Sequence, residues 1–214
     1  MKYFILILFF FGVFTSQAQT KAVTESGDTI LVYDNGTWKN IQKFQNPTEI
    51  ESTVKVSVVA DEFTGDKLKT SDVWLVFGEN EPTRNTISGY AFQKSSIPVF
   101  YLRYSGDLGC MSQLRSTMMV KLTNGEVIEF TQITDTECGD AETVGFIPAT
   151  KEQIESGDYE VFVLENIEQL KSYDWETIRI SGTEYYSDLK PKVNKKIPNP
   201  EQFFRQHIIA LESN

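Results

Sequence analysis

Histidine and cysteine, which often serve as nucleophiles, general bases and metal ligands, are scarce in this chain of 214 residues. His207 is the one histidine, and Cys110 and Cys138 are the two cysteines. A Ser-His-Asp or Cys-His system would need His207, and the sequence contains no Gly-x-Ser-x-Gly motif. His207 flanks the apolar face of an amphipathic C-terminal segment, which favours a partly buried structural histidine over a general base. We therefore expect no catalytic residue, no cofactor and no transition-metal site.

A short acidic cluster is the weak candidate for a metal site. It consists of Asp135, Glu137, Asp140 and Glu142. Calcium takes about six to eight hard oxygen ligands, and alternating carboxylates on a loop can supply several of them. The spacing does not match the EF-hand loop, so a solvated acidic loop is the favoured interpretation and calcium is the alternative.

Aromatic side chains are the candidates for ligand binding. Trp38, Trp175, Tyr185 and Tyr186 form a candidate platform on which a sugar or a peptide would stack. Trp38 and Trp175 are followed by polar residues, whereas Trp74 lies in an apolar run and is expected in the core. Core or interface packing is the alternative for the whole set, and it is the favoured one.

Acidic residues outnumber basic ones by 30 to 20, which gives a formal net charge of −10. Nucleic-acid binding needs basic charge to displace phosphate counterions, so this balance argues against a nucleic-acid partner. The 40% of hydrophobic residues is ordinary for a folded globular protein.

The first 18 residues have the pattern of a secretory signal peptide. Lys2 precedes the apolar run Phe4–Phe14, and the small residues Ser16 and Ala18 follow it. The run is too short to span a hydrocarbon core of about 30 Å as a helix, so an uncleaved membrane anchor is the lesser alternative. Export to the periplasm or the cell exterior follows, with no transmembrane segment after cleavage.

Residues 19–46 predict a small β-hairpin module. Thr29–Tyr33 is strand-like, and the turn signal Asp34-Asn35-Gly36 is followed by Thr37-Trp38. Together with the signal peptide ending Ser16-Gln17-Ala18-Gln19, this D-x-G-T-W hairpin resembles the N-termini of exported proteins of Bacteroidetes-type bacteria. The resemblance covers residues 1–41, and it implies an extracytoplasmic location without implying an activity.

Residues 47–214 predict a mainly-β (α+β) domain, built as an antiparallel sheet or a β-sandwich. Two short helices are expected after the caps Thr150 and Asn166, and an amphipathic helix after Asn199-Pro200 presents Phe204, Ile208 and Leu211 on one face. The expected strands are the period-2 segment 54–58 and the runs Val73–Phe77, Ile97–Tyr104, Thr117–Thr123, Glu126–Ile133, Tyr159–Leu164 and Thr177–Ile180. Val73–Phe77 is continuously apolar, so this strand is expected to be buried on both faces.

Asn124-Gly125 marks the clearest hairpin, and its register predicts a disulfide. A three-residue loop with a left-handed Gly125 makes Leu122 face Glu126. This register pairs apolar residues with each other more fully than a two-residue loop would. Continued outward, it places Cys110 opposite Cys138, and an oxidising compartment favours their bonding. Two separate thiols remain the alternative.

These features predict an exported, non-enzymatic protein that binds an unknown ligand or supports an assembly of the cell envelope. Its expected partner is an unidentified protein or glycan of the envelope. The alternative is a secreted glycan-acting hydrolase that uses two carboxylates among the 30 acidic residues. A groove that contains two close carboxylates would favour the hydrolase.

We predict that the exported protein begins at Gln19, because signal peptidase cleaves after a small residue such as Ala18. N-terminal sequencing of protein recovered from outside the cytoplasm checks this. Recovery of Met1 would contradict the prediction.

Overall fold

The computed structural model describes the chain in seven ranges: 19–23, 29–33, 38–41, 51–94, 96–139, 142–157 and 159–213. The chain divides into two compact units, Met1–Thr48 and Glu49–Asn214. The predicted signal peptide lies outside the described residues. No helix among the described residues is long and apolar enough to cross a membrane.

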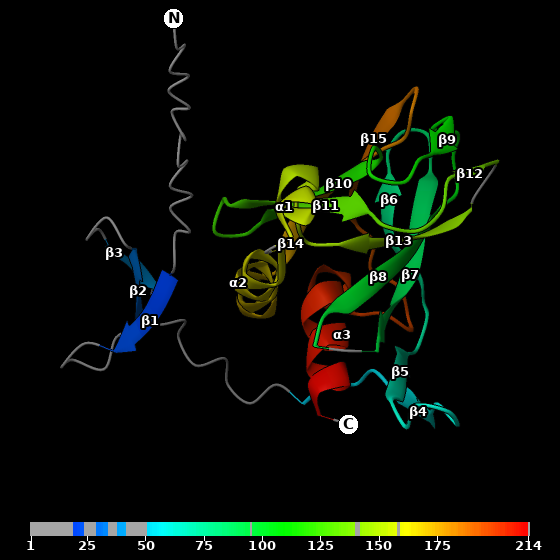
Figure 1. The fold of residues 1–214 in the computed structure, drawn as a ribbon. Helices are drawn as coiled ribbons and strands as arrows, with labels where there is room; N and C mark the ends of the chain where they lie inside the picture. The colour runs from blue at the N-terminus through cyan, green and yellow to red at the C-terminus, as the bar shows by residue number, and fades with distance from the viewer. Residues whose placement is uncertain are drawn as a thin grey trace, which may run out of the picture. The chain divides into compact units, whose positions relative to one another are not determined.

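The first unit contains a three-stranded antiparallel sheet (Figure 1). Its strands are β1 (Gln19–Val23), β2 (Thr29–Tyr33) and β3 (Trp38–Ile41), in that order. Val32 faces Trp38 across the β2–β3 pair. The sequence predicts this hairpin, and β1 adds a third strand to it.

The second unit is built on a closed antiparallel barrel, which confirms the prediction of a mainly-β antiparallel fold. Within the described part of this unit, eight strands form the ring in the order β7-β6-β15-β14-β10-β11-β13-β8, and β8 pairs again with β7. They are β6 (Trp74–Asn80), β7 (Asn85–Gln93), β8 (Pro98–Tyr104), β10 (Thr117–Leu122), β11 (Val127–Gln132), β13 (Thr143–Ile147), β14 (Trp175–Ser181) and β15 (Tyr186–Pro191).

The long strand β7 makes the closure possible because its two edges are used differently. One edge pairs with β8 from Ile87 to Gln93. The other pairs first with β6 and then, at Phe92 and Gln93, with β5 (Lys67–Ser71). Strand β4 (Val56–Ala60) pairs with β5 and ends the sheet outside the ring.

The C-terminal helix α3 (Phe203–Glu212) packs against the barrel, as Figure 1 shows in red. Phe203 stacks on Phe77 of β6 with ring centroids 4.0 Å apart, and Phe204 lies 5.1 Å from Phe100 of β8. Burying each such phenyl ring stabilises the fold by roughly 1.5–3 kcal/mol. The predicted face of Phe204, Ile208 and Leu211 is buried as expected.

The remaining helices correct two predictions. Thr150 caps α1 (Lys151–Ser156) with a capping box, as expected. Residues Tyr159–Leu164 are helical rather than a strand, because they begin α2 (Tyr159–Ser172), which buries Val163, Ile167 and Leu170 at helical spacing. Asn166 is therefore inside a helix and not its cap. Its side chain donates instead to the Pro148 carbonyl at 2.8 Å.

The start of the last helix also differs from the prediction. Asn199 makes no capping hydrogen bond with its side chain, and Pro200 opens a short 3₁₀ turn, η1 (Pro200–Gln202), before α3. The Pro200 carbonyl accepts a hydrogen bond from the buried Trp175 indole at 2.8 Å. This bond ties the start of the last helical segment to the barrel strand β14.

The hairpin between β10 and β11 has the predicted register. Gly125 has a φ of +87°, and the Leu122 N–H donates to the Glu126 carbonyl at 2.8 Å. Met118 faces Phe130 and Val120 faces Ile128, and all four of these apolar side chains are buried.

The same register continues to the cysteines. Cys110 on β9 (Cys110–Met111) faces Cys138 on β12 (Glu137–Cys138), and the two form a disulfide with Cα atoms 4.2 Å apart. Residues 112–116 and 132–136 lie between the β9–β12 pair and the paired part of the β10–β11 hairpin, and they do not continue its regular ladder. Both segments have the same length, so β9 and β12 keep the register of the hairpin.

We expect Cys138→Ser to lower the free energy of unfolding by about 3–4 kcal/mol, because the disulfide closes a loop across a sequence separation of 28 residues. Urea denaturation of the variant and of the oxidised wild type measures this difference. Wild type treated with reductant should match the variant. Equal stability of the oxidised and reduced proteins would contradict the prediction.

Candidate functional site

The second unit contains a groove of about 430 Å³, which is within the size range of small-molecule sites. It lies between the residues before β4, the β5–β6 turn with the start of β6, and the connector that leads into α3. Its lining combines apolar and polar side chains: Thr53, Val54, Asp72, Val73, Trp74, Leu75, Lys196, Ile197, Pro198, Asn199, Gln202 and Gln206.

A β-bulge in β6 shapes one wall of the groove. Trp74 faces Gly89 on β7 and Gly78 faces Ile87, so β6 has two more residues than β7 between these pairs. Val76 in the bulge has a φ of +62°, a left-handed conformation that is rare for a β-branched residue. The Asn194 side chain donates to the Val76 carbonyl at 3.0 Å and supports this conformation.

The bulge corrects the prediction that Val73–Phe77 forms a strand buried on both faces. It turns Phe77 into the core, while Val73 is 52% and Leu75 63% exposed. A regular strand would point Trp74 and Phe77 to opposite faces. Here both contact Phe203 of α3, and the aliphatic side chains on either side of Trp74 are left at the groove.

The structure reverses the burial that the sequence predicts for two tryptophans, Trp74 in the core and Trp175 at the surface. Trp175 is buried, and its ring packs edge-on against Phe77, so it cannot belong to a surface platform. Trp74 is half-buried and lines the groove. Its ring lies 5.0 Å from His207 and 5.8 Å from Phe203, both in edge-on geometry.

The other predicted platform residues lie outside this groove. Tyr185 and Tyr186 are 57% and 63% exposed at the start of β15. The guanidinium of Arg179 lies 4.5 Å from the centre of the Tyr186 ring and also binds Asp188. The side chain of Trp38 lies outside the described residues.

The acidic cluster is described only in part, because Asp140 lies outside the described residues. Glu137 and Glu142 are exposed, and the Asp135 carbonyl accepts a hydrogen bond from the buried Gln132 amide at 3.0 Å. Among the described residues, no three His, Cys, Asp or Glu side chains are grouped so that they could hold a metal ion.

Polar groups of three kinds face the groove. The Asp72 carboxylate, the Lys196 ammonium and the Asn199 amide are exposed, and none has a hydrogen-bond partner within the described part of the chain. Gln202 accepts a bond from Gln206 at 3.3 Å, which leaves its own amide N–H groups available. The groove-lining residues therefore carry one carboxylate, one ammonium group and three amides, of which the Gln206 amide already binds Thr53 and Gln202.

Asp72 is the one carboxylate among the groove-lining residues. Elsewhere, burial raises the pKa of Glu129 on β11, and the nearby Glu152 of α1 raises it further. Neither glutamate lines the groove. Among the described residues that line the groove there is thus one carboxylate, whereas most glycoside hydrolases use a pair.

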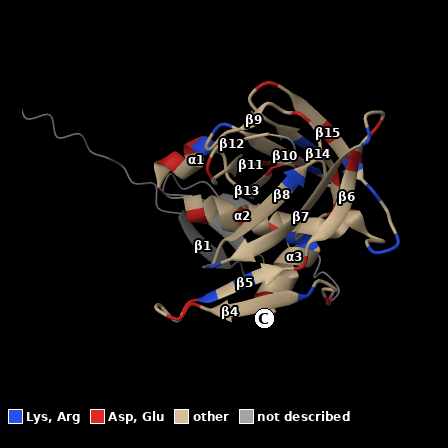
Figure 2. Ribbon diagram, turned by 90° about the vertical axis from the view of Figure 1, so that its right-hand side faces the viewer, with Lys and Arg blue, Asp and Glu red and all other residues tan. Residues whose placement is uncertain are grey.

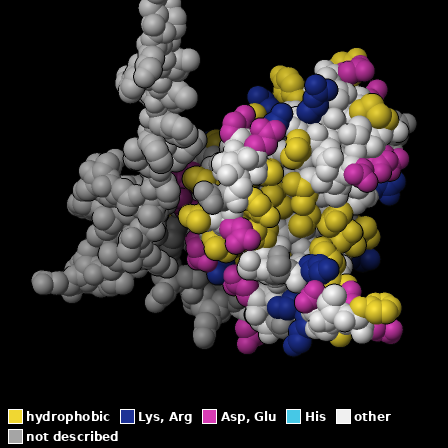
Figure 3. Space-filling model, viewed as in Figure 1, with side chains coloured by type: hydrophobic (Ala, Val, Ile, Leu, Met, Phe, Trp, Pro, Cys, Tyr) yellow, Lys and Arg dark blue, Asp and Glu magenta, His cyan; other side chains and the backbone are white. Residues whose placement is uncertain are grey.

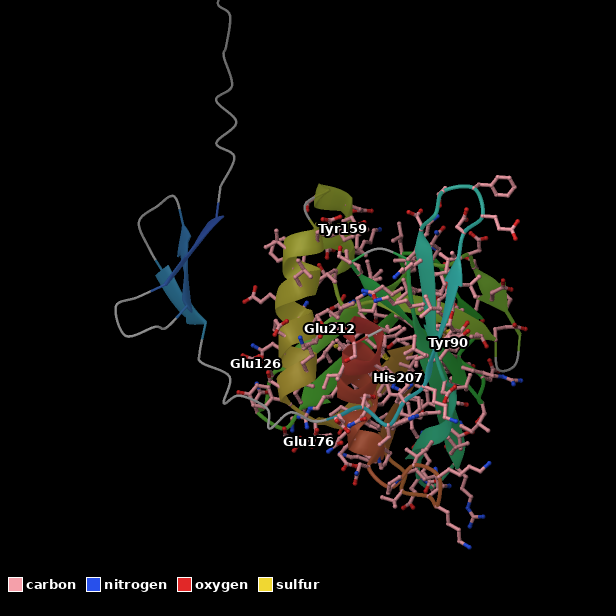
Figure 4. All side chains as sticks on the ribbon, turned by 90° about the horizontal axis from the view of Figure 1, so that it is seen from below. Tyr90, Glu126, Tyr159, Glu176, His207 and Glu212 are labelled. Atoms are coloured by element: carbon pink, nitrogen blue, oxygen red, sulfur yellow. A yellow bond between two sulfur atoms is a disulfide. The ribbon has the colours of Figure 1, made fainter. Side chains whose placement is uncertain are left out.

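His207, which Figure 4 labels on α3, packs its ring edge-on against Trp74 and supports the floor of the groove. Its Nδ1 lies 2.7 Å from the Phe203 carbonyl and its Nε2 lies 3.2 Å from the Asp72 carbonyl. Burial lowers the pKa of His207 to about 4, although both carbonyls oppose the shift by favouring the protonated ring. The histidine is therefore a neutral structural residue at pH 7, and it is more deeply buried than the sequence predicts.

Comparisons with protein-family models, curated proteins and solved structures found no match to the chain.

We predict that His207 makes the protein less stable as the pH falls from about 6.5 to about 4. The unfolded state binds the proton near pH 6.5 and the folded state near pH 4, so lowering the pH favours unfolding by roughly 3 kcal/mol over this interval. Urea denaturation at several pH values should show this loss for wild type in excess of His207→Gln. Equal pH dependence of the two proteins would contradict the prediction.

Proposed function

We propose that this is an exported, non-enzymatic binding protein of the cell envelope, and that the groove beside Trp74 holds a glycan segment. The groove itself carries the proposal, because a half-buried tryptophan is combined with unpaired hydrogen-bonding groups in one hollow of ligand size.

The lining suits a sugar, which has apolar C–H faces and a rim of hydroxyl groups. Trp74 supplies an apolar aromatic surface, and Leu75 and Val73 extend it. Asp72 accepts hydrogen bonds, whereas Asn199 and Gln202 both accept and donate them. Because the Trp74 ring is held against His207 and Phe203, little side-chain entropy is lost when a ligand stacks on it.

An extracytoplasmic location is part of the proposal. The signal-peptide pattern of residues 1–18 supports it, and so does the Cys110–Cys138 disulfide, because disulfides persist in oxidising compartments. The alternative of a glycan hydrolase needs a second carboxylate about 5–9.5 Å from the first. The lining of the groove supplies Asp72 alone, which favours binding without hydrolysis.

We expect Trp74→Ala to weaken the binding of envelope oligosaccharides by roughly tenfold or more, since aromatic anchors carry much of the affinity of such sites. Soluble oligosaccharides released from purified envelope polysaccharide serve as the probe in calorimetric titration. Trp74→Phe, which keeps an aromatic ring over His207, should retain part of the affinity.

Tyr186→Ala is the matched control, because it removes an exposed aromatic ring away from the groove. Loss of binding in Tyr186→Ala with full binding in Trp74→Ala would overturn the proposed site. Release of new reducing ends from the bound oligosaccharide, abolished by Asp72→Asn, would instead favour the hydrolase.

A further inference from the structure

Within the described part of the chain, strand β4 is an edge of the sheet outside the barrel ring. It pairs there with β5 on one side only, and Figure 2 shows it beside β5 at the lower end of the second unit. Its sequence Val-Ser-Val-Val-Ala has no charged residue, and Val58 and Val59 are 44% and 59% exposed. Natural proteins usually protect such edges with charges, proline or a covering segment, and a bare apolar edge invites pairing with another strand.

The hydrogen bonds on either side of β4 show which backbone groups are unused. The Asp72 N–H donates to the Lys55 carbonyl, and the Asp61 N–H donates to the Asp66 carbonyl, each at 2.8 Å. Residues 55 and 61 therefore direct their backbone groups towards β5, as does every second residue between them. Val56, Val58 and Ala60 direct their N–H and C=O groups away from β5, to the open edge.

We propose that this edge pairs with the same edge of a second copy of the chain, antiparallel and about a two-fold axis at Val58. Val58 then faces Val58 of the partner subunit, and Val56 faces Ala60 of the partner subunit. In this register every outward-directed residue of one copy faces an outward-directed residue of the other. Each such facing pair therefore exchanges two backbone hydrogen bonds.

Charge complementarity selects this register. Lys55 and Asp61 flank β4 and lie equally far from Val58, so Lys55 faces Asp61 of the partner subunit at both ends of the pairing. Facing residues that do not exchange backbone hydrogen bonds have the closest side chains, which suits an ion pair. Asp61 Oδ1 accepts from the N–H groups of Phe63 and Thr64, and its other oxygen remains available for the lysine.

The two neighbouring registers are poorer. Centring the axis on Ser57 places Lys55 opposite Val59, and centring it on Val59 places Lys55 opposite Phe63. Both registers separate Lys55 from Asp61 of the partner subunit. In each of them, one of the three outward-directed residues of β4 no longer faces an outward-directed residue of the other copy. Pairing of five residues buries less surface than a standard interface, so the dimer is weak and forms at high protein concentration.

Sedimentation of the purified protein up to about 1 mM tests the dimer. Wild type should associate reversibly, and Val58→Pro should weaken association by roughly tenfold or more. Proline removes the N–H at the axis, and this N–H has no partner within the β4–β5 pair, so the monomer keeps its fold. Lys55→Glu should also weaken the dimer, whereas Lys55→Arg should not. A protein that stays monomeric, or a dimer unaffected by Val58→Pro, would overturn the proposal.

Disulfide trapping tests the register. Both native cysteines are bonded to each other, so Val58→Cys adds a single free thiol, which the axis places about 5.5 Å in Cα separation from its copy. Val59→Cys is the matched control, because Val59 is the more exposed of the two neighbours and faces Ser57 of the partner subunit. Faster covalent dimerisation of Val58→Cys supports the register. Equal or faster dimerisation of Val59→Cys would overturn it.

Discussion

The burial of two adjacent phenylalanines at the start of α3 organises the second unit. Phe203 stacks on Phe77 of β6, and Phe204 contacts Phe100 and Phe130 on the opposite part of the barrel wall. An antiparallel barrel can fill its interior only with side chains that its own strands or an inserted element supply. Here the barrel strands supply most of them, and the last helix adds Phe203 and Phe204. Ile208 and Leu211 are buried as well, so the C-terminal segment is part of the core.

The groove is a consequence of that packing. Phe203 and His207 occupy the space beneath Trp74, and the bulge at Val76 allows both Trp74 and Phe77 to reach the same helix. Leu75 is turned outward as a result. The exposed aliphatic side chains and the strained backbone at Val76 are thus found together with the unpaired polar groups of the groove. Figure 3 shows further hydrophobic side chains on the barrel surface, over β8 and β13.

Closure of the barrel also decides where the ten-stranded sheet of the second unit has an edge. The ring strands pair on both sides, and the end beyond β10 and β11 is fastened by the Cys110–Cys138 disulfide. Thr183 lies in the turn between β14 and β15 and fixes this end further. Its hydroxyl accepts a hydrogen bond from the Cys110 N–H, and its own N–H donates to the Cys110 carbonyl, each at 2.9 Å. The open edge is then displaced to β4, which leaves the ring where β7 changes its partner from β6 to β5.

Features that depend on a local pattern could be predicted before the fold was known: the Gly125 turn, the Leu122–Glu126 register, the facing cysteines, the Thr150 cap and the apolar face of α3. Features that depend on distant neighbours could not. Residues 159–164 have strand-like composition, yet Val163 and Ile167 are spaced for a helix that packs on α3. Trp74 and Trp175 are both amphipathic rings, and only the bulge in β6 and the bond to Pro200 decide which one reaches the surface. The groove was not predictable because it joins residues 53, 72–75 and 196–206, whose proximity is created by closure of the barrel.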